Sequence, residues 1–349
     1  MTRNRSTQPR HCLLAAILVA IVSSALPCQA IALDASRDDV RVFIDRLVKK
    51  HGFDEAWVRS MLEQSKTRQK ILDAISRPAE RTRPWHEYRK IFITPKRIDA
   101  GAAFMTEYAD KLARASARTG VPGEIIAAII GVETFYGRRT GHYRVIDALA
   151  TLGFDYPPRA RFFRGQLEEL FMLAREEQFE LTDLLGSYAG AMGPPQFIPS
   201  SYRAYAVDGD GDGRRDLLGN WDDILMSVAN YFVKNGWQTG EPVAVRGTSA
   251  RNFPVPTGGN LLQTTETVAS LARRGITFET DLDPAAPAQL ISLEGETERE
   301  YWVGFHNFYV ITRYNRSAMY ALAVLQLSDA LRAAYAADSE PGAASRNGP

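Results

Sequence analysis

Apolar residues recur at helical spacing along most of the chain. Between Ser36 and Gly52 they follow the i, i+3, i+4, i+7 pattern, which predicts an amphipathic helix with Ser36 and Asp39 as a capping pair and Gly52 at its end. A second helix is expected from Thr94-Pro95 to Gly120, because proline is favoured in the first helical turn. Further helices are expected over 122–136, 161–178, 221–235 and 317–335.

The pattern changes between residues 241 and 305. Short β-like runs at 243–245, 290–293 and 301–303 lie among glycine, proline and threonine, and one short helix is expected near 265–273. The pattern therefore predicts a mainly α protein with a small β-containing insert.

The first thirty residues have the layout of an export signal. Three arginines precede an apolar run over 13–22 that is too short to span a bilayer comfortably, and small residues follow it. Both cysteines, Cys12 and Cys28, lie in this segment, so a mature chain starting near residue 31 would contain no thiol. An uncleaved anchor and a lipid on Cys28 stay open as alternatives.

Composition excludes several classes of protein. With 45% hydrophobic, 24% charged and 10% aromatic residues, the chain is neither disordered nor collagen-like. The formal net charge of +1 gives no overall field that would favour nucleic acid as a partner. The five histidines form no HExxH pair, which argues against a zinc peptidase.

One carboxylate is expected at the end of a buried helix. Residues 122–132 are apolar on every side, and Glu133 follows them beside Phe135 and Tyr136. Partial burial and the negative end of the helix dipole both disfavour an ionised carboxylate, so we expect a raised pKa that suits a general acid. The alternative is a structural ion pair with Arg138 or Arg139.

The segment 187–202 combines small residues with hydroxyls, an amide and aromatic rings. Such a segment lets backbone approach a ligand closely and could line a sugar groove, although an ordered loop between helices would have the same composition.

Five motifs, in this order, resemble the lytic murein transglycosylase B family, which are periplasmic peptidoglycan-cleaving enzymes with a lysozyme-like core. They are Gly131-Val-Glu-Thr134 with Gly137-Arg138, Asp147-Ala-Leu-Ala-Thr-Leu152, the Gly-Ala-Met-Gly to Pro-Ser-Ser-Tyr202 block, Ser227-Val-Ala-Asn-Tyr231 and Thr312-Arg-Tyr-Asn315. Together the five motifs make the resemblance specific, whereas any one of them alone would be weak evidence for it. The likeness extends from about residue 36 to residue 335.

The resemblance implies a lysozyme-like helical core with a helical domain around it. We accordingly expect a signal peptide over 1–30, an N-terminal helical part over 31–120 and a catalytic core over 121–240. The β-containing insert would cover 241–305, a helical segment completing the groove would cover 306–336, and a disordered tail would cover 337–349. Export would make the protein periplasmic.

The resemblance also implies the chemistry. Glu133 would protonate the leaving oxygen of the β-1,4 bond between N-acetylmuramic acid and N-acetylglucosamine. As carboxylate it would then take the proton of the muramoyl C6 hydroxyl while that oxygen attacks C1, leaving a 1,6-anhydro end. Ordinary glycosidases need a second carboxyl group, whereas here the substrate supplies the nucleophile. A water-using muramidase and a non-catalytic peptidoglycan-binding module are the alternatives.

Matching positions imply the substrate contacts. Ser187 and Asn315 would contact the N-acetyl group or the reacting ring, and Gln196 would hydrogen-bond the substrate. Arg159 would meet a peptide or muramic carboxylate. The groove walls would be Tyr88, Phe197, Tyr231, Tyr314 and Tyr320. The chain departs from the family pattern at Pro194-Pro195 and at Ile198; two prolines remove two backbone donors, which puts the loop shape in question.

An acidic loop follows this block. Asp208, Asp210 and Asp212 alternate with glycine, and Gly213 occupies the sixth position, as in the front half of an EF-hand loop. Position twelve is Gly219 rather than glutamate, so the literal motif fails there, and Asp216, Asp222 or Asp223 could close a longer loop. The family resemblance favours a later aspartate, best matched by Asp223. The alternative is a solvated Asp-Gly turn, but three aspartates at alternate positions repel one another without a cation. The expected ligands of a structural Ca²⁺ are Asp208, Asp210, Asp212, Arg214 and Asp223. No organic cofactor is expected, the partner would be peptidoglycan glycan strands, and the protein would be a monomer, peripheral to the membrane only if lipidated.

Overall fold

The computed structural model describes residues 31–76, 83–253 and 266–339. The predicted signal segment 1–30 lies outside them, as does most of the predicted tail 337–349. Within these ranges no helix combines the length and the apolar character needed to cross a bilayer.

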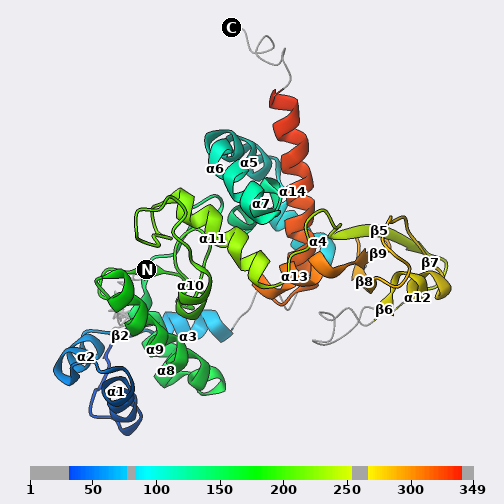
Figure 1. The fold of residues 1–349 in the computed structure, drawn as a ribbon. Coiled ribbons are helices and arrows are strands. Elements are labelled where there is room, and N and C mark those ends of the chain that lie inside the picture. The colour runs from blue at the N-terminus through cyan, green and yellow to red at the C-terminus, as the bar shows by residue number, and fades with distance from the viewer. Residues whose placement is uncertain (1–30, 77–82, 254–265, 340–349) are drawn as a thin grey trace, which may run out of the picture.

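Helices dominate the described chain, as the sequence predicts, and Figure 1 shows how they are arranged. In chain order they are α1 (Asp38–His51), α2 (Glu55–Glu63), α3 (Gln69–Ser76), α4 (Trp85–Phe92), α5 (Pro95–Glu107), α6 (Ala109–Thr119), α7 (Gly123–Thr134), α8 (Val145–Asp155), α9 (Ala160–Glu177), α10 (Pro199–Tyr205), α11 (Trp221–Lys234), α12 (Val268–Arg273), α13 (His306–Tyr314) and α14 (Ala318–Ser339).

The strands are short outside one small sheet. They are β1 (Ile31–Ala32), β2 (Lys66–Thr67), β3 (Tyr143–Arg144), β4 (Leu185–Gly186), β5 (Ala244–Ser249), β6 (Glu266–Thr267), β7 (Ile276–Thr277), β8 (Pro287–Glu294) and β9 (Arg299–Gly304). The predicted insert is confirmed as an antiparallel sheet of order β6-β8-β9-β5-β7, lying beside the helices in Figure 1. Its register pairs Val245 with Val303 and Ile291 with Trp302. A second, small hydrophobic core forms there around Leu271, Val303 and Phe305.

The first helix ends as predicted but begins differently. Gly52 adopts a φ of 67° and its amide donates to Val48 O, as expected of a glycine that closes a helix. The predicted capping pair is wrong: Arg37 is the N-cap residue, and its side chain makes no capping hydrogen bond to the helix. Ser36 donates to Asp34 and Asp39 pairs with Arg37, because these closer partners satisfy both side chains.

The single helix predicted from Thr94 to Gly120 is two helices. Thr94 caps the first by accepting the amide of Arg97 at 3.2 Å, as its position before Pro95 suggests. The chain breaks at Tyr108, whose φ of −109° and ψ of 24° are not helical. Its ring packs 4.8 Å from that of Phe104 and 4.9 Å from that of Trp221, so contacts from outside the segment outweigh local helix propensity here.

Helix α7 lies in the interior of the helical core, packed between α5, α6 and α14 (Figure 1). All of its residues from Ile125 to Val132 are buried. The α5–α7 contact is close because both helices present glycine to the ring of Tyr136: a Cβ at Gly101 or Gly131 would lie 2.2 or 2.7 Å from the Tyr136 hydroxyl oxygen.

Helix α14 begins at Ala318, close to the expected start, and runs to Ser339 rather than Tyr335. Residues 337–339 therefore belong to a helix and not to a disordered tail, because the alanine-rich end of this segment favours continuation. Helix α13 lies within the helical segment expected over 306–336, separated from α14 by a short junction.

Asp147, from the second motif, anchors α8 to the N-terminal segment. Its side chain is fully buried. The carboxylate accepts from Lys66 N at 2.9 Å and from Arg68 Nε and Nη2 at 3.1 and 3.0 Å. These bonds fix β2 against α8, so this motif residue has a structural role.

Candidate active site

Glu133 lies in the last turn of α7 and is half-buried. The Tyr320 hydroxyl, from α14, donates to Glu133 Oε1 at 2.6 Å. Tyr320 is only 2% exposed, and burial together with the charge of Glu133 raises the pKa of its phenol well above the usual value. The carboxylate therefore faces a phenol that keeps its proton throughout the physiological range.

The chain turns sharply directly after Glu133. Phe135 and Tyr136 both adopt left-handed backbone conformations, with φ of 52° and 59°. Such residues cost about 1–3 kcal/mol each and persist only where the surroundings enforce them. Thr134 supplies part of that enforcement: its hydroxyl donates to Pro194 O at 2.9 Å and accepts the amide of Gly137 at 3.0 Å. The end of α7 is thus joined to the loop that carries Gln196.

That loop, residues 186–197, is folded back on itself. Isolated bridges pair Met192 with Gly186 and with Phe197. Gly193 has a φ of 64°, and a Cβ there would lie 2.0 Å from Leu217 O, so only glycine fits. The Ser187 hydroxyl accepts the amide of Ala191 at 3.1 Å.

Gln196 holds the same loop through its side chain. Its Nε2 donates to Thr140 O at 3.0 Å and to Gly193 O at 2.9 Å, and its φ is 51°. The amide nitrogen is therefore used within the protein, and the carbonyl oxygen is the atom that Gln196 offers to a ligand.

The two prolines that depart from the family pattern are accommodated. Their missing N–H groups leave only carbonyls to satisfy, and both carbonyls are bonded: Pro194 O accepts from Thr134, and Pro195 O accepts from the Tyr314 hydroxyl at 2.7 Å. Ile198 is the N-cap residue of α10. The prolines thus attach the loop to α7 on one side and to the end of α13 on the other.

Three of the expected groove aromatics form one cluster. The ring centroid of Phe197 lies 5.8 Å from those of Tyr231 and Tyr314, which are 4.8 Å apart. The Tyr231 hydroxyl donates to Arg313 O at 2.5 Å, and burial raises its pKa to about 12. Because their hydroxyls bond the backbone carbonyls of Arg313 and Pro195, Tyr231 and Tyr314 are held in place by the protein itself.

Tyr88 and Asn315 are two further residues of the expected set. Tyr88, on α4, is 2% exposed and contributes to the raised pKa of Tyr320. Asn315 follows Tyr314 directly, in extended conformation between α13 and α14. The structure thus brings Tyr320, Tyr88 and Tyr314 near Glu133, and Phe197 and Tyr231 pack against Tyr314.

Arg159 lies apart from this set. It ends the 3₁₀ turn Pro157–Arg159 before α9, and its guanidinium lies over the rings of Phe162 and Phe163, 4.4 and 5.0 Å from their centroids. Arg159 is exposed and is the N-cap residue of α9.

The ion pair considered for Glu133 is not formed by either arginine. The guanidiniums of Arg138 and Arg139 each lie 5.5 Å from the ring centroid of Phe135, and within residues 31–76, 83–253 and 266–339 neither joins an ion pair. Arg97, which sequence analysis did not single out, approaches the same ring to 5.2 Å.

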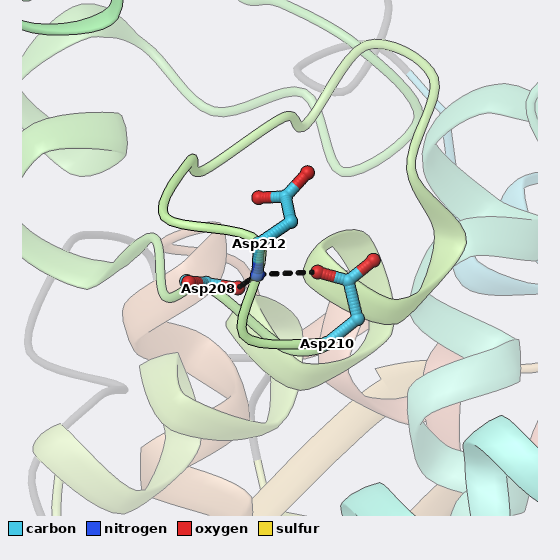
Figure 2. A group of neighbouring side chains, drawn as sticks. All are labelled: Asp208, Asp210 and Asp212. Atoms are coloured by element: carbon cyan, nitrogen blue, oxygen red, sulfur yellow. Dashed lines mark hydrogen bonds between the residues drawn. The ribbon is translucent and has the colours of Figure 1, made fainter.

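Figure 2 shows the acidic loop with Asp208, Asp210 and Asp212, in which the backbone amide of Asp212 donates to the carboxylates of the other two. Each offers a carboxylate oxygen within 4.8 Å of the others. Asp208 accepts the amides of Gly211 and Gly213 at 2.6 and 2.8 Å, which holds the loop in shape and lowers the pKa of its carboxyl group. Three converging carboxylates fit a hard cation such as Ca²⁺.

The three candidates for closing the loop differ in environment. Asp222 pairs with Lys111 and Arg114 and is thereby committed elsewhere. Asp216 accepts the amides of Leu218 and Gly219. Asp223 is fully buried and accepts the amides of Gly209 at 2.7 Å and Asp216 at 2.6 Å, one from each end of the loop. Asp223 therefore closes the loop through hydrogen bonds, and burial raises its pKa.

The chain matches the family model described as "Transglycosylase SLT domain" over residues 35–329. This match covers all of the residues around Glu133. The chain belongs to the SLT transglycosylase family. It is 44% identical over 308 residues to membrane-bound lytic murein transglycosylase B of Escherichia coli (strain K12), covering 85% of this chain and 83% of that protein.

Solved structures of lytic transglycosylases have the same fold. Catenated SltB1 from Pseudomonas aeruginosa superposes with a TM-score of 0.81 at 48% identity, covering 86% of this chain and 98% of that one. E. coli Slt35 in complex with calcium superposes with a TM-score of 0.79 at 42% identity, covering 88% of this chain and 97% of that one. SltB3 from P. aeruginosa in complex with NAG-NAM-pentapeptide superposes with a TM-score of 0.72 at 29% identity, covering 84% of this chain and 78% of that one.

The expected family, fold class and enzyme class are confirmed. The protein is a peptidoglycan lytic transglycosylase with a mainly α, lysozyme-like fold. The side chains around Glu133 are the ones available for that reaction.

Proposed function

We propose that Glu133 is the single acid/base of the transglycosylase reaction. As carboxylic acid it gives its proton to the glycosidic oxygen on C4 of N-acetylglucosamine while the bond from that oxygen to C1 of N-acetylmuramic acid breaks. As carboxylate it then takes the proton of the muramoyl C6 hydroxyl while O6 forms a new bond to C1. The proton returns to Glu133, no water is consumed, and the new end is 1,6-anhydromuramic acid.

One observation carries this proposal: the hydrogen bond from Tyr320 to Glu133 Oε1 at the edge of the aromatic cluster. The phenol fixes one carboxyl oxygen and thereby restricts the rotation of the carboxyl group. General acid–base catalysis needs this kind of positioning, with the acid within hydrogen-bond reach of a defined atom.

Product analysis tests the proposal against both alternatives. We expect purified peptidoglycan digested by the wild-type protein to yield muropeptides with anhydro ends, each lighter by one water than a hydrolysed end. Mass spectrometry distinguishes the two. Hydrolysed ends would indicate a water-using muramidase, which needs a second carboxyl group. Absence of soluble products from an otherwise folded protein would indicate a binding module.

We propose that the glycan strand of peptidoglycan lies along the aromatic cluster, bounded by Tyr88, Phe197, Tyr231, Tyr314 and Tyr320. Ser187, Gln196 and Asn315 supply polar contacts to the N-acetyl groups and the reacting ring. The SltB3 complex with NAG-NAM-pentapeptide, from a relative of the same fold, supports a substrate that carries both sugar and peptide. Arg159, on the side of α9, is proposed to meet carboxylates only of a strand long enough to reach it. The protein would act in the periplasm as a monomer after loss of residues 1–30.

We further propose that the acidic loop binds one structural Ca²⁺ through Asp208, Asp210, Asp212 and the carbonyl of Arg214. Asp223 is the proposed closing residue. The converging carboxylates and the calcium complex of E. coli Slt35 support this proposal. The ion would join the loop to the start of α11, and thereby steady the helix that carries Tyr231.

Calcium is therefore expected to stabilise the protein. A ligand that binds only the folded state raises the free energy of unfolding by about 2.7 kcal/mol when its concentration is a hundredfold above its dissociation constant. Differential scanning fluorimetry should show a melting temperature that rises with Ca²⁺ and falls with a chelator. Asp210→Asn should abolish the response, while Asp183→Asn, an exposed aspartate outside the loop, should retain it. A wild-type protein whose melting temperature ignores both additions would contradict the proposed site.

A further inference from the structure

Three guanidinium groups converge on the ring of Phe135, two residues after Glu133. Arg97 lies 5.2 Å from the ring centroid, and Arg138 and Arg139 each lie 5.5 Å from it. They come from two separate segments, because Arg97 is on α5 while the other two follow α7. The left-handed conformation of Phe135 places its ring among them.

The charge of this cluster is not balanced by the protein. In the described part of the chain, none of the three arginines forms an ion pair, although many other arginines of this protein do. Arg97 is only 8% exposed; its Nη1 donates to Ile91 O at 2.6 Å, while its Nε is buried without an acceptor. Burial, with the neighbouring charge of Arg139, lowers the pKa of Arg97. Buried charges are normally paired with an opposite charge, so this cluster lacks the anion that would normally balance it.

The cluster is also open to a ligand. Arg138 and Arg139 are exposed, so their guanidiniums can be reached from solvent, while Arg97 supports them from beneath the surface. Guanidinium groups bind planar carboxylates through paired hydrogen bonds, and two of them side by side favour such an anion over a neutral sugar. The backbone of Arg139 donates to Thr134 O at 2.9 Å, which fixes this segment to the turn that carries Glu133.

We propose that Arg97, Arg138 and Arg139 form a carboxylate-binding subsite for the peptide that a glycan strand carries beside the reacting bond. The proposal rests on the proposed function, since Glu133 defines where that bond lies. Arg138 and Arg139 contact the carboxylate, and Arg97 strengthens the field from below. The subsite would make the enzyme prefer strands with peptides over bare glycan.

The test compares two substrates: glycan strands that carry their peptides, and the same strands from which an amidase has removed them. We expect Arg138→Gln/Arg139→Gln to lower the ratio of kcat/KM between the two by about tenfold or more, since hydrogen bonds to charged groups are worth that much. The loss should appear mainly in KM for peptide-bearing strands. Raising the salt concentration should lower the ratio for wild type and leave the double variant nearly unchanged.

Arg118→Gln is the matched control, because Arg118 is exposed at the end of α6, distant in sequence from the cluster. Its ratio should match wild type. An unchanged ratio in the double variant, or equal losses on both substrates, would overturn the subsite. A failure of the Glu133 chemistry would look different: the wild type would then give ends without the anhydro ring on both substrates, whatever the ratio.

Discussion

Glu133→Gln should reduce cleavage of peptidoglycan by at least about a thousandfold, since general acid and base contributions reach 10²–10⁴ and one residue here supplies both. The amide keeps the shape of the carboxylate, and its oxygen can still accept the hydrogen bond from Tyr320. Glycan binding should therefore persist. Release of soluble anhydromuropeptides measures the first effect, and co-sedimentation with insoluble peptidoglycan measures the second.

Glu124→Gln, in the first turn of the same helix, provides the control. Glu124 undergoes the same chemical change, lies near Arg332 at 3.5 Å, and stands at the opposite end of α7 from Glu133. It should retain nearly full activity. If Glu133→Gln kept activity within tenfold of wild type while remaining folded, the acid/base assignment would be rejected.

Asp147→Asn should have the largest effect on stability. Asp147 is fully buried and accepts three hydrogen bonds from Lys66 and Arg68. Arg68 is 37% exposed, so the loss arises at the buried carboxylate: hydrogen bonds to a charged group contribute about 1.5–3 kcal/mol each, and an amide cannot accept all of them. At about 2–4 °C per kcal/mol for a chain of this order of size, thermal unfolding should move down by roughly 6 °C or more.

Asp155→Asn gives a comparison on the same helix. Asp155 bonds Arg37 at 2.7 Å, but both side chains are partly exposed, at 28% and 35%. Pairs of this kind contribute about 0–1 kcal/mol, so its melting temperature should move by about 3 °C or less. Equal shifts in the two variants would show that the burial of Asp147 does not increase the contribution of its hydrogen bonds to stability.

Much of the fold could be predicted because it follows local rules. The buried helix α7, the glycine that closes α1, the proline that starts α5 and the β-containing insert all follow from residue pattern and cap chemistry. The break at Tyr108 could not be predicted, because its cause is the ring of Trp221, more than one hundred residues later. The capping of α1 failed for a similar reason: Arg37 is drawn to Asp155 across the structure.

For the candidate site, too, some features follow from local sequence and others depend on tertiary contacts. Glu133 and the aromatic residues could be identified from motifs, and the structure brings most of them together. Motifs do not reveal how a side chain is used within the protein. Gln196 was expected to hydrogen-bond the substrate, and the structure adds that its amide nitrogen bonds the carbonyls of Thr140 and Gly193. Arg97 was missed because a lone arginine near the start of a helix carries no signal; its partners become visible only when α5 meets the turn after α7.

The bond between Tyr320 and Glu133 joins residues 187 positions apart in the chain. During synthesis, the acid emerges from the ribosome long before the phenol that positions it, and the helix carrying that phenol is the last in the described chain. A nascent or prematurely terminated polypeptide ending before α14 consequently lacks the phenol that holds Glu133. On the proposed assignment of Glu133 as the acid/base, the ability to cut the cell wall would thereby depend on synthesis of this last helix.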